Sequence, residues 1–442
     1  MKRLKVLTVY ASAMHLSRRS LLKLAAAGSI AYPLGAFAAE QSANDEKIIL
    51  SAPLTHPDWM LKPGTAWGPE GVHHMLDACK ACGWWRVHWR VLDGGRALYK
   101  SKIVRPEFKM ETDNIWDPQT DEEKRLYKRF FANVSEERRQ EIERLQQRYD
   151  YSTFDTLAEA VRYGHQIGLQ IHAWVSINED DHGWGLISDF ARDHQPLVWV
   201  KRDGTRYHSQ MSFAFPEVRQ YKLAIIDELL SNYDIDGLFL DWIRTGDIRD
   251  NPQTDAKGVA DSGYEGPNVR AFKSKFAVDP HDVPNDDDRW VKLRAEPQTV
   301  FMRAVRERVN RDPKRRPICA MVGHPWHYRG VGDKIDGSLR GLLLDIATWA
   351  NEGLVDATIA AGYYRDGGDA TKAYKALRDE TGGKVDVWYF GWVPNSVAEF
   401  DRDVAAAKQL GAKHLLYWEA DYIDDRSAAA ELKAAMSRRA KW

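Results

Sequence analysis

The 442-residue sequence predicts an α/β fold, a single (β/α)8 TIM barrel with helical and loop insertions, and three observations support this prediction. From about residue 70 onward, segments with helical periodicity alternate with short apolar strands, a pattern typical of parallel βαβ units. The chain is long enough for one such barrel, which takes roughly 250 residues and tolerates long insertions. No Gly-rich phosphate loop follows an early strand, which favours the closed barrel over a doubly wound open sheet.

Two repeats of this alternation are especially clear. A helix that begins at Pro216 leads into the apolar strand 236–240. Another helix begins with Ser396 and Glu399, which have the spacing of a capping box, and precedes the last strand. Counting such units gives strands near residues 84–91, 169–176, 236–241, 317–323, 355–361, 385–391 and 413–419. The remaining strand, third in chain order, is placed by elimination near 207–213.

The domain organisation follows from the same patterns and from local composition. Residues 100–150 contain a densely charged run, which indicates a helical insertion after the first predicted strand. Residues 245–290 are rich in Asp, Gly, Pro and Asn and indicate a long loop over the top of the barrel. The predicted segments are therefore a leader (1–38), an N-terminal lead-in (39–69), the barrel with its two insertions (70–430) and a C-terminal tail (431–442).

The leader has the pattern of a twin-arginine signal peptide. Arg18 and Arg19 lie in the segment 17–23, an Ala-rich apolar run follows, and residues 36–38 form a small-residue cleavage site. The apolar run is too short to span a bilayer permanently. We therefore expect a protein exported to the periplasm or secreted, without stable membrane insertion.

The composition excludes some partners and favours another. Lys and Arg number 63 and Asp and Glu 64, so the net charge of -1 provides no field that would attract nucleic acid or an anionic membrane. Tryptophan is unusually frequent, at 17 residues. Indole faces cover the apolar face of a sugar ring, so this frequency favours a saccharide cleft, although many of these side chains can equally fill a large core.

The three cysteines are too few for a disulfide framework. Cys79 and Cys82 form a CxxC pair, but Cys79 continues the apolar stripe of a helix, and no second Cys/His pair with ligand spacing accompanies them. Cys319 lies in a predicted buried strand. We therefore expect the cysteines to be core residues, and we expect no cofactor.

Three segments together carry a family resemblance. They are residues 172–174 (His-Ala-Trp), residues 215–219 (Phe-Pro-Glu-Val-Arg) and residues 233–241, which read Tyr-Asp-Ile-Asp-Gly-Leu-Phe-Leu-Asp. In this order and spacing they resemble the glycosyl hydrolase-like family 10 barrels, a family similar to the hydrolase half of poly-N-acetylglucosamine processing proteins. The resemblance covers roughly residues 80–420. It implies a (β/α)8 barrel that acts on glycosidic bonds of a polysaccharide, with an acid after strand 236–241 central to the site.

The resemblance also implies paired acids after this strand, whereas here Trp242 follows Asp241, so a second carboxyl group must come from elsewhere. Glycoside hydrolysis usually needs two carboxyl groups. Asp241, which ends an apolar strand, is our candidate nucleophile or general base; the alternative is a structural carboxylate paired with Arg244 or Arg90. Glu419, beside an indole, is the candidate general acid.

Glu179, after strand 169–176, is the alternative acid. Asp241 and Glu419 follow strands on opposite sides of the predicted barrel, and a wide separation suits an inverting enzyme better than a retaining one. If Glu179 replaces Glu419, the stereochemical outcome stays open.

Substrate-binding candidates lie at or near predicted strand ends. His172 could bind a sugar hydroxyl or be a core histidine, and Arg90 could bind a hydroxyl or carboxylate of a glycan or pair with a structural acid. The complete set is Arg90, His172, Trp174, Trp242, His324, Tyr363, Trp392 and Trp418, of which the four tryptophans are the stacking candidates.

Two other functions remain open at this level. A carbohydrate-binding barrel without catalysis would keep the cleft but not the second acid. A metal-dependent hydrolase or deacetylase would need several His or Asp ligands on neighbouring strand ends. The candidate set is His172, His324 and Asp241, which are scattered over the second, fifth and fourth predicted strands. Replacing Asp241 or Glu419 by its amide distinguishes catalysis from binding. The sequence indicates neither the glycan nor the oligomeric state.

Overall fold

The computed structural model describes residues 47–54, 66–105, 149–178, 180, 188–241, 243, 254–323, 337–361, 367–418 and 420–441, with single positions between 121 and 144. Most of the predicted insertion 100–150 therefore lies outside the described residues. Within the described part, no helix is long and apolar enough to cross a membrane.

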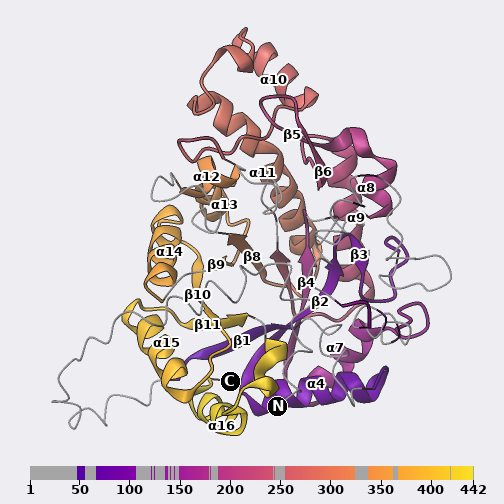
Figure 1. Ribbon diagram of the computed structural model, residues 1–442, viewed down its shortest axis with the longest axis vertical. Coiled ribbons are helices and arrows are strands. Elements are labelled where there is room, and N and C mark those ends of the chain that lie inside the picture. The colour runs from indigo at the N-terminus through magenta and orange to yellow at the C-terminus, as the bar shows by residue number, and fades with distance from the viewer. Residues whose placement is uncertain are drawn as a thin grey trace.

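A closed parallel β-barrel forms the centre of the molecule (Figure 1). Its strands in chain order are β1 (Ile49–Leu54), β2 (Trp84–Asp93), β4 (Gln170–Ser176), β7 (Gly237–Asp241), β8 (Ile318–Gly323), β9 (Ala357–Ala361), β10 (Asp386–Trp392) and β11 (His414–Trp418). Each pairs in parallel with its neighbour, and the barrel closes because β1 pairs with both β11 and β2. The predicted (β/α)8 fold is confirmed.

One strand prediction is wrong, and one barrel strand was missed. The segment predicted near 207–213 contains β6 (Arg206–Met211), which pairs antiparallel with β5 (Val198–Val200) in a separate two-stranded sheet. The missed strand is β1, which lies in the stretch assigned to a lead-in, so the barrel begins well before residue 70. Counting strands by the helices that precede them passes over β1, because the clear helical pattern begins only after it.

These two errors cancel in the strand count, since one strand was added and one was omitted before β7. The strands predicted near 84–91 and 169–176 are the second and third of the barrel, while β7 is still the fourth and β11 still the eighth. In either direction around the barrel, three strands separate β7 from β11.

Helices surround the barrel (Figure 1). Between successive strands the described residues include α4 (Pro69–Ala81), α7 (Thr156–Gln166), α9 (Pro216–Asn232), α11 (Asp288–Arg311), α12 (Gly337–Leu342), α13 (Ile346–Asn351), α14 (Gly367–Glu380) and α15 (Val397–Gln409). The start of α15 is capped as the sequence predicts, because the Ser396 hydroxyl accepts the Glu399 N–H at 3.2 Å.

The C-terminal segment belongs to this outer layer. Residues 431–442 were assigned to a tail, but the helix α16 (Ala429–Arg439) runs through most of them and buries Leu432 and Met436. Ala440 then forms a parallel bridge with Ile48, next to β1. The segment therefore closes the outer layer where the barrel itself closes.

The described part of the second insertion is more than a loop. It contains α10 (Gly266–Phe276), and Tyr264, Phe272 and Trp290 form a small core of their own beside the start of α11. Figure 1 shows α10 projecting at one end of the molecule. The sequence predicted only a long loop here, because the few aromatic residues of this helix lie among turn-forming residues.

Cys79, Cys82 and Cys319 are buried and free, as the sequence predicts. Several tryptophans are fully buried core residues: Trp84, Trp89, Trp174, Trp199, Trp290 and Trp349.

Candidate active site

Strand register decides which side chains lie at the mouth of the barrel. Side chains alternate along a strand, so His172, Trp174 and Ser176 of β4 all face the interior. Ser176 lies opposite Asp241, and His172 lies opposite Gly237. Because catalytic residues of (β/α)8 barrels lie at the carboxyl ends of the strands, Asp241, the last residue of β7, is in the expected position.

Asp241 is held by the indole of Trp174. The indole Nε1–H donates a hydrogen bond to Asp241 Oδ2 at 2.9 Å. Asp241 is 0% exposed and Trp174 is 2% exposed. Trp174 is therefore too buried to be a sugar-stacking surface, and its contribution is to orient the carboxyl group.

Arg90 lies against the same indole. Its guanidinium carbon is 4.5 Å from the centre of the Trp174 ring, a cation–π contact. Its Nη2 donates to Asp93 Oδ1 at 2.6 Å and lies 3.5 Å from Ser176 Oγ. The ion pair with Asp93 is almost completely buried. The sequence left two roles open for Arg90, and the structure shows the second of them, pairing with an acid.

A strand irregularity makes this ion pair possible. Residues three apart normally point to opposite faces of a strand, but the register between β2 and β4 shifts between Arg90 and Leu92. Such a bulge rotates the following residues, which lets Asp93 reach Arg90. The buried positive charge is thus fixed close to the indole that bonds Asp241.

Aromatic side chains extend this arrangement along the mouth. Trp418, at the end of β11, contacts Trp174 edge to face with ring centres 5.0 Å apart. Phe390 lies 6.2 Å from Trp418 and 5.8 Å from Trp392. Trp392 and Trp418 are only half-buried. We call Phe390, Trp392 and Trp418 the aromatic wall; its two tryptophans keep exposed surface for stacking.

His172 does not reach the mouth. The Ser176–Asp241 pair is four residues further along the strands than the His172–Gly237 pair, or about 13 Å at 3.3 Å per residue. The His172 ring lies 5.4 Å from that of His88, and both are buried. Burial lowers the pKa of each imidazole well below its ordinary value, so both are neutral. The structure therefore shows the core histidine that the sequence left open.

Asp180, close to the candidate acid Glu179, has a structural role. Its carboxylate accepts two contacts from Lys222 Nζ on α9, at 2.8 and 3.1 Å, and both side chains are fully buried. It also accepts the Ser188 hydroxyl at 2.9 Å. This ion pair attaches the chain after β4 to the outer helix α9.

Five predicted site residues lie outside the described residues: Glu179, Trp242, His324, Tyr363 and Glu419. Each follows within a few positions a strand that ends at the mouth, so their roles stay predictions. The candidate metal ligands do not come together as a set, because His172 lies at the level of Gly237, four residues before Asp241 along the strands. No group of three or more His, Cys, Asp or Glu side chains in the described ranges could hold a metal ion.

Sequence reasoning missed three features of this site: Ser176, the bulge that brings Asp93 to Arg90, and Trp174 as a hydrogen-bond donor. The period of two along β4 was a usable signal, since it places Ser176 on the same face as Trp174. The bulge had no comparable signal in the sequence.

A (β/α)8 barrel with a carboxyl group, a buried arginine and half-buried indoles at its mouth has the architecture of a glycoside hydrolase barrel. Comparison with known families agrees. Residues 119–387 match the family described as Glycosyl hydrolase-like 10, and the chain belongs to this family. The resemblance found in the sequence is thereby confirmed.

Solved structures share the fold. The PgaB (BpsB) glycoside hydrolase domain of Bordetella bronchiseptica is similar at a TM-score of 0.53 and 11% identity, over 88% of this chain and 99% of that one. The catalytic domain of the β-amylase of Paenibacillus polymyxa is similar at 0.52 and 10%, over 90% and 99%. Alpha-L-fucosidase isoenzyme 2 of Paenibacillus thiaminolyticus is similar at 0.52 and 11%, over 88% and 49%.

A curated relative in sequence is an S-layer-related protein of Niallia circulans, 32% identical over 127 residues. The match covers 25% of this chain and 8% of that protein, so it relates one segment of this chain to a small part of that protein.

Proposed function

We propose that the protein hydrolyses O-glycosidic bonds of an oligosaccharide or polysaccharide, with Asp241 as the nucleophile or general base. The observation that carries this proposal is the Asp241 carboxyl group at the end of the fourth barrel strand, oriented by the Trp174 Nε1–H. Family membership supports a glycoside hydrolase-like activity.

In an inverting reaction, Asp241 removes a proton from water while the water oxygen attacks the anomeric carbon. The bond from that carbon to the leaving oxygen breaks, and a second carboxylic acid protonates the leaving oxygen. The hydrogen bond that Trp174 Nε1–H donates to Oδ2 orients the carboxyl group. In a retaining reaction an oxygen of the Asp241 carboxylate attacks the anomeric carbon directly.

Glu419 is our choice for the second acid because it follows Trp418, whose ring packs against Trp174. A single indole therefore connects the end of β11 with Asp241, although the two strands are on opposite sides of the barrel. Glu179 is the alternative. The half-buried Trp392 and Trp418 supply stacking surface for sugar rings.

The experiment is a screen of the purified protein against bacterial and plant polysaccharides, with reducing-end release as the measure and the Asp241→Asn variant beside the wild type. Hydrolysis of one polysaccharide that disappears in Asp241→Asn supports the proposal. The anomeric configuration of the first product, followed by proton NMR during hydrolysis by the wild type, distinguishes the two mechanisms, because an inverting enzyme releases the opposite anomer and a retaining enzyme the same one. Equal activity in the wild type and Asp241→Asn would refute the assignment.

A second candidate, a carbohydrate-binding barrel without catalysis, is favoured by one observation. The Asp241 side chain has no exposed surface, and the Trp174 indole lies against it. If this candidate is right, Asp241→Asn changes only the affinity for the saccharide.

We also propose that the protein is exported by the twin-arginine route. The basis is the Arg18-Arg19 pair and the apolar run after it. Replacing both arginines by lysine should retain the full-length precursor in the cytoplasm. Unchanged appearance of mature protein outside the cytoplasm would contradict this proposal.

A further inference from the structure

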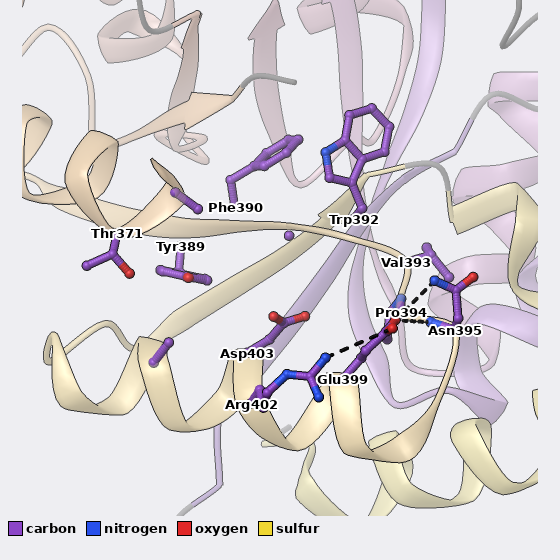
Figure 2. A pocket seen from close by; sticks show the side chains of 13 residues that line it. Thr371, Tyr389, Phe390, Trp392, Val393, Pro394, Asn395, Glu399, Arg402 and Asp403 are labelled. Carbon is purple, nitrogen blue, oxygen red and sulfur yellow. Dashed lines mark hydrogen bonds and ion pairs between the residues drawn. The ribbon is translucent and has the colours of Figure 1, made fainter. Parts of the chain in front are cut away.

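A pocket lies on the outer side of the barrel wall, between α14 and α15. It has a volume of about 620 Å³. Figure 2 shows Asp403 and Arg402 on α15 facing one side of β10, while the rings of Phe390 and Trp392 turn to the other side. The pocket is therefore separated by β10 from the interior that contains Asp241.

A glycine makes room for the polar end of this pocket. A Cβ atom on Gly391 would lie 2.9 Å from Tyr417 Cε1 and 3.6 Å from Asp403 Oδ2. With no side chain there, the Tyr417 hydroxyl reaches across and donates to Asp403 Oδ2 at 3.1 Å. Thr371 and Tyr389 add two further hydroxyl groups to the lining.

Asp403 is half-buried, and none of the ion pairs found among the described residues involves it. Tyr417 is its one hydrogen-bond donor within these residues, so Oδ1 keeps its capacity to accept. Burial raises the pKa of Asp403 to about 6, and the bond from Tyr417 acts in the opposite direction. A carboxyl group in such surroundings gains most from hydroxyl donors that a ligand brings with it.

The charges at the rim of the pocket compensate one another. Arg402 Nη2 lies 4.0 Å from Glu399 Oε1, and Glu399 Oε2 accepts both the backbone N–H and the side-chain amide of Asn395. The remaining lining is apolar and includes Pro394 and Ala406. A neutral ligand with hydroxyl groups and an apolar face fits this lining better than an ion of either sign.

We propose that this pocket is a second saccharide-binding site, in which a neutral sugar unit donates hydroxyl hydrogen bonds to Asp403 and packs its C–H face on Pro394 and Ala406. The volume is within the roughly 300–1,000 Å³ of small-molecule sites. The site would hold a glycan against the outside of the wall whose inner side carries Phe390 and Trp392. The inference goes beyond the proposed hydrolysis and does not require it.

The test is calorimetric titration of the full chain in an Asp241→Asn background, which prevents turnover, with cellotetraose, maltotetraose, xylotetraose and N-acetylated chitotetraose. Ala406→Trp fills the pocket from α15. Its matched control is Ala405→Trp, one residue away on the exposed face of the same helix. Asp403→Asn keeps the shape of the side chain and an acceptor for Tyr417 but removes the charge. This variant tests the proposed site if Ala406→Trp does not fold.

We expect at least one tetrasaccharide to bind with an affinity that falls about tenfold or more in Ala406→Trp and Asp403→Asn, and that stays unchanged in Ala405→Trp. The inference is overturned if no tetrasaccharide loses affinity in the pocket variants, whether because none binds or because all bind elsewhere. Failure of the hydrolase proposal has a different signature, since the wild type would then release no reducing ends while binding in the pocket persists.

Discussion

The two ends of the barrel interior contain polar side chains in opposite conditions. At the mouth, Asp241 is bonded by Trp174, and Arg90 is paired with Asp93. At the floor, no hydrogen-bond partner for the ring nitrogens of His88 and His172 occurs within the described residues. A bonded charged group can do chemistry at a protected site, whereas a neutral buried imidazole mainly fills space. Position along the strand, more than residue type, thus separates the candidate site from the core.

Asp241→Asn should have the largest effect. The amide keeps the size of the side chain and removes its basicity, so we expect hydrolysis to fall at least about a thousandfold, with thermal stability nearly unchanged. The measurement is reducing-end release on the polysaccharide identified by the screen. Asp401→Asn is the matched control, because this exposed acid pairs with Arg439 on the outer surface. If both variants lose activity equally, the mouth has no special role.

Gly237→Ala should have the largest effect on the stability of the floor. The added Cβ would lie 2.4 Å from His172 Cε1 and 2.9 Å from the backbone oxygen of Pro317. Neither group can move easily, so we expect a loss of about 3 kcal/mol in the free energy of unfolding, as for other overpacked cores. Urea titration measures it.

The control for this change is Gly266→Ala, where the new Cβ would meet only the flexible end of Arg270. Adding His172→Ala to Gly237→Ala removes the clash with the imidazole and should therefore recover part of the lost stability. The recovery is incomplete because the clash with the Pro317 backbone oxygen remains. Equal stability of Gly237→Ala and Gly266→Ala would show that the floor is not tightly packed around His172.

Trp174→Phe tests whether the mouth depends on the hydrogen bond or only on aromatic packing. Phenylalanine keeps most of the contact with Trp418 but cannot donate to Asp241, so we expect hydrolysis to fall by about 10- to 100-fold. Trp349→Phe is the matched control, since Trp349 is equally buried and donates to Thr299 Oγ1 at 3.0 Å away from the mouth. Similar losses of activity in both variants would indicate a general effect of destabilisation.

The sequence predicts the barrel and the strand end that carries Asp241, because both depend on local apolar patterns. It places His172 and Asp241 on the second and fourth predicted strands, whereas in the structure their strands are neighbours. Their relative heights could not be predicted, because height depends on the register that pairing sets in the folded barrel. The pairing of Arg90 with Asp93 could not be foreseen, since it needs an irregularity in β2. The error at 207–213 arose because that strand was placed by elimination: with β1 missed, one more strand was needed to complete the eight.

The smallest effect concerns the acid sensitivity of the floor. In the folded protein the pKa of His172 is held by burial well below its unfolded value near 6.5, so below that pH the unfolded chain binds more protons. This histidine therefore contributes stability that is present above about pH 6.5 and is lost as the pH falls, at up to about 1.4 kcal/mol per pH unit.

His172→Met fills a similar volume with an adaptable apolar side chain and removes this loss. Urea titrations at pH 7.5 and pH 5 should show a smaller drop in the variant than in the wild type, with unchanged hydrolysis at pH 7.5. An equal drop in both proteins would contradict this role of His172. A loss of hydrolysis in the variant would mean that the floor is coupled to the mouth through Phe239, which lies between His88 and Trp174.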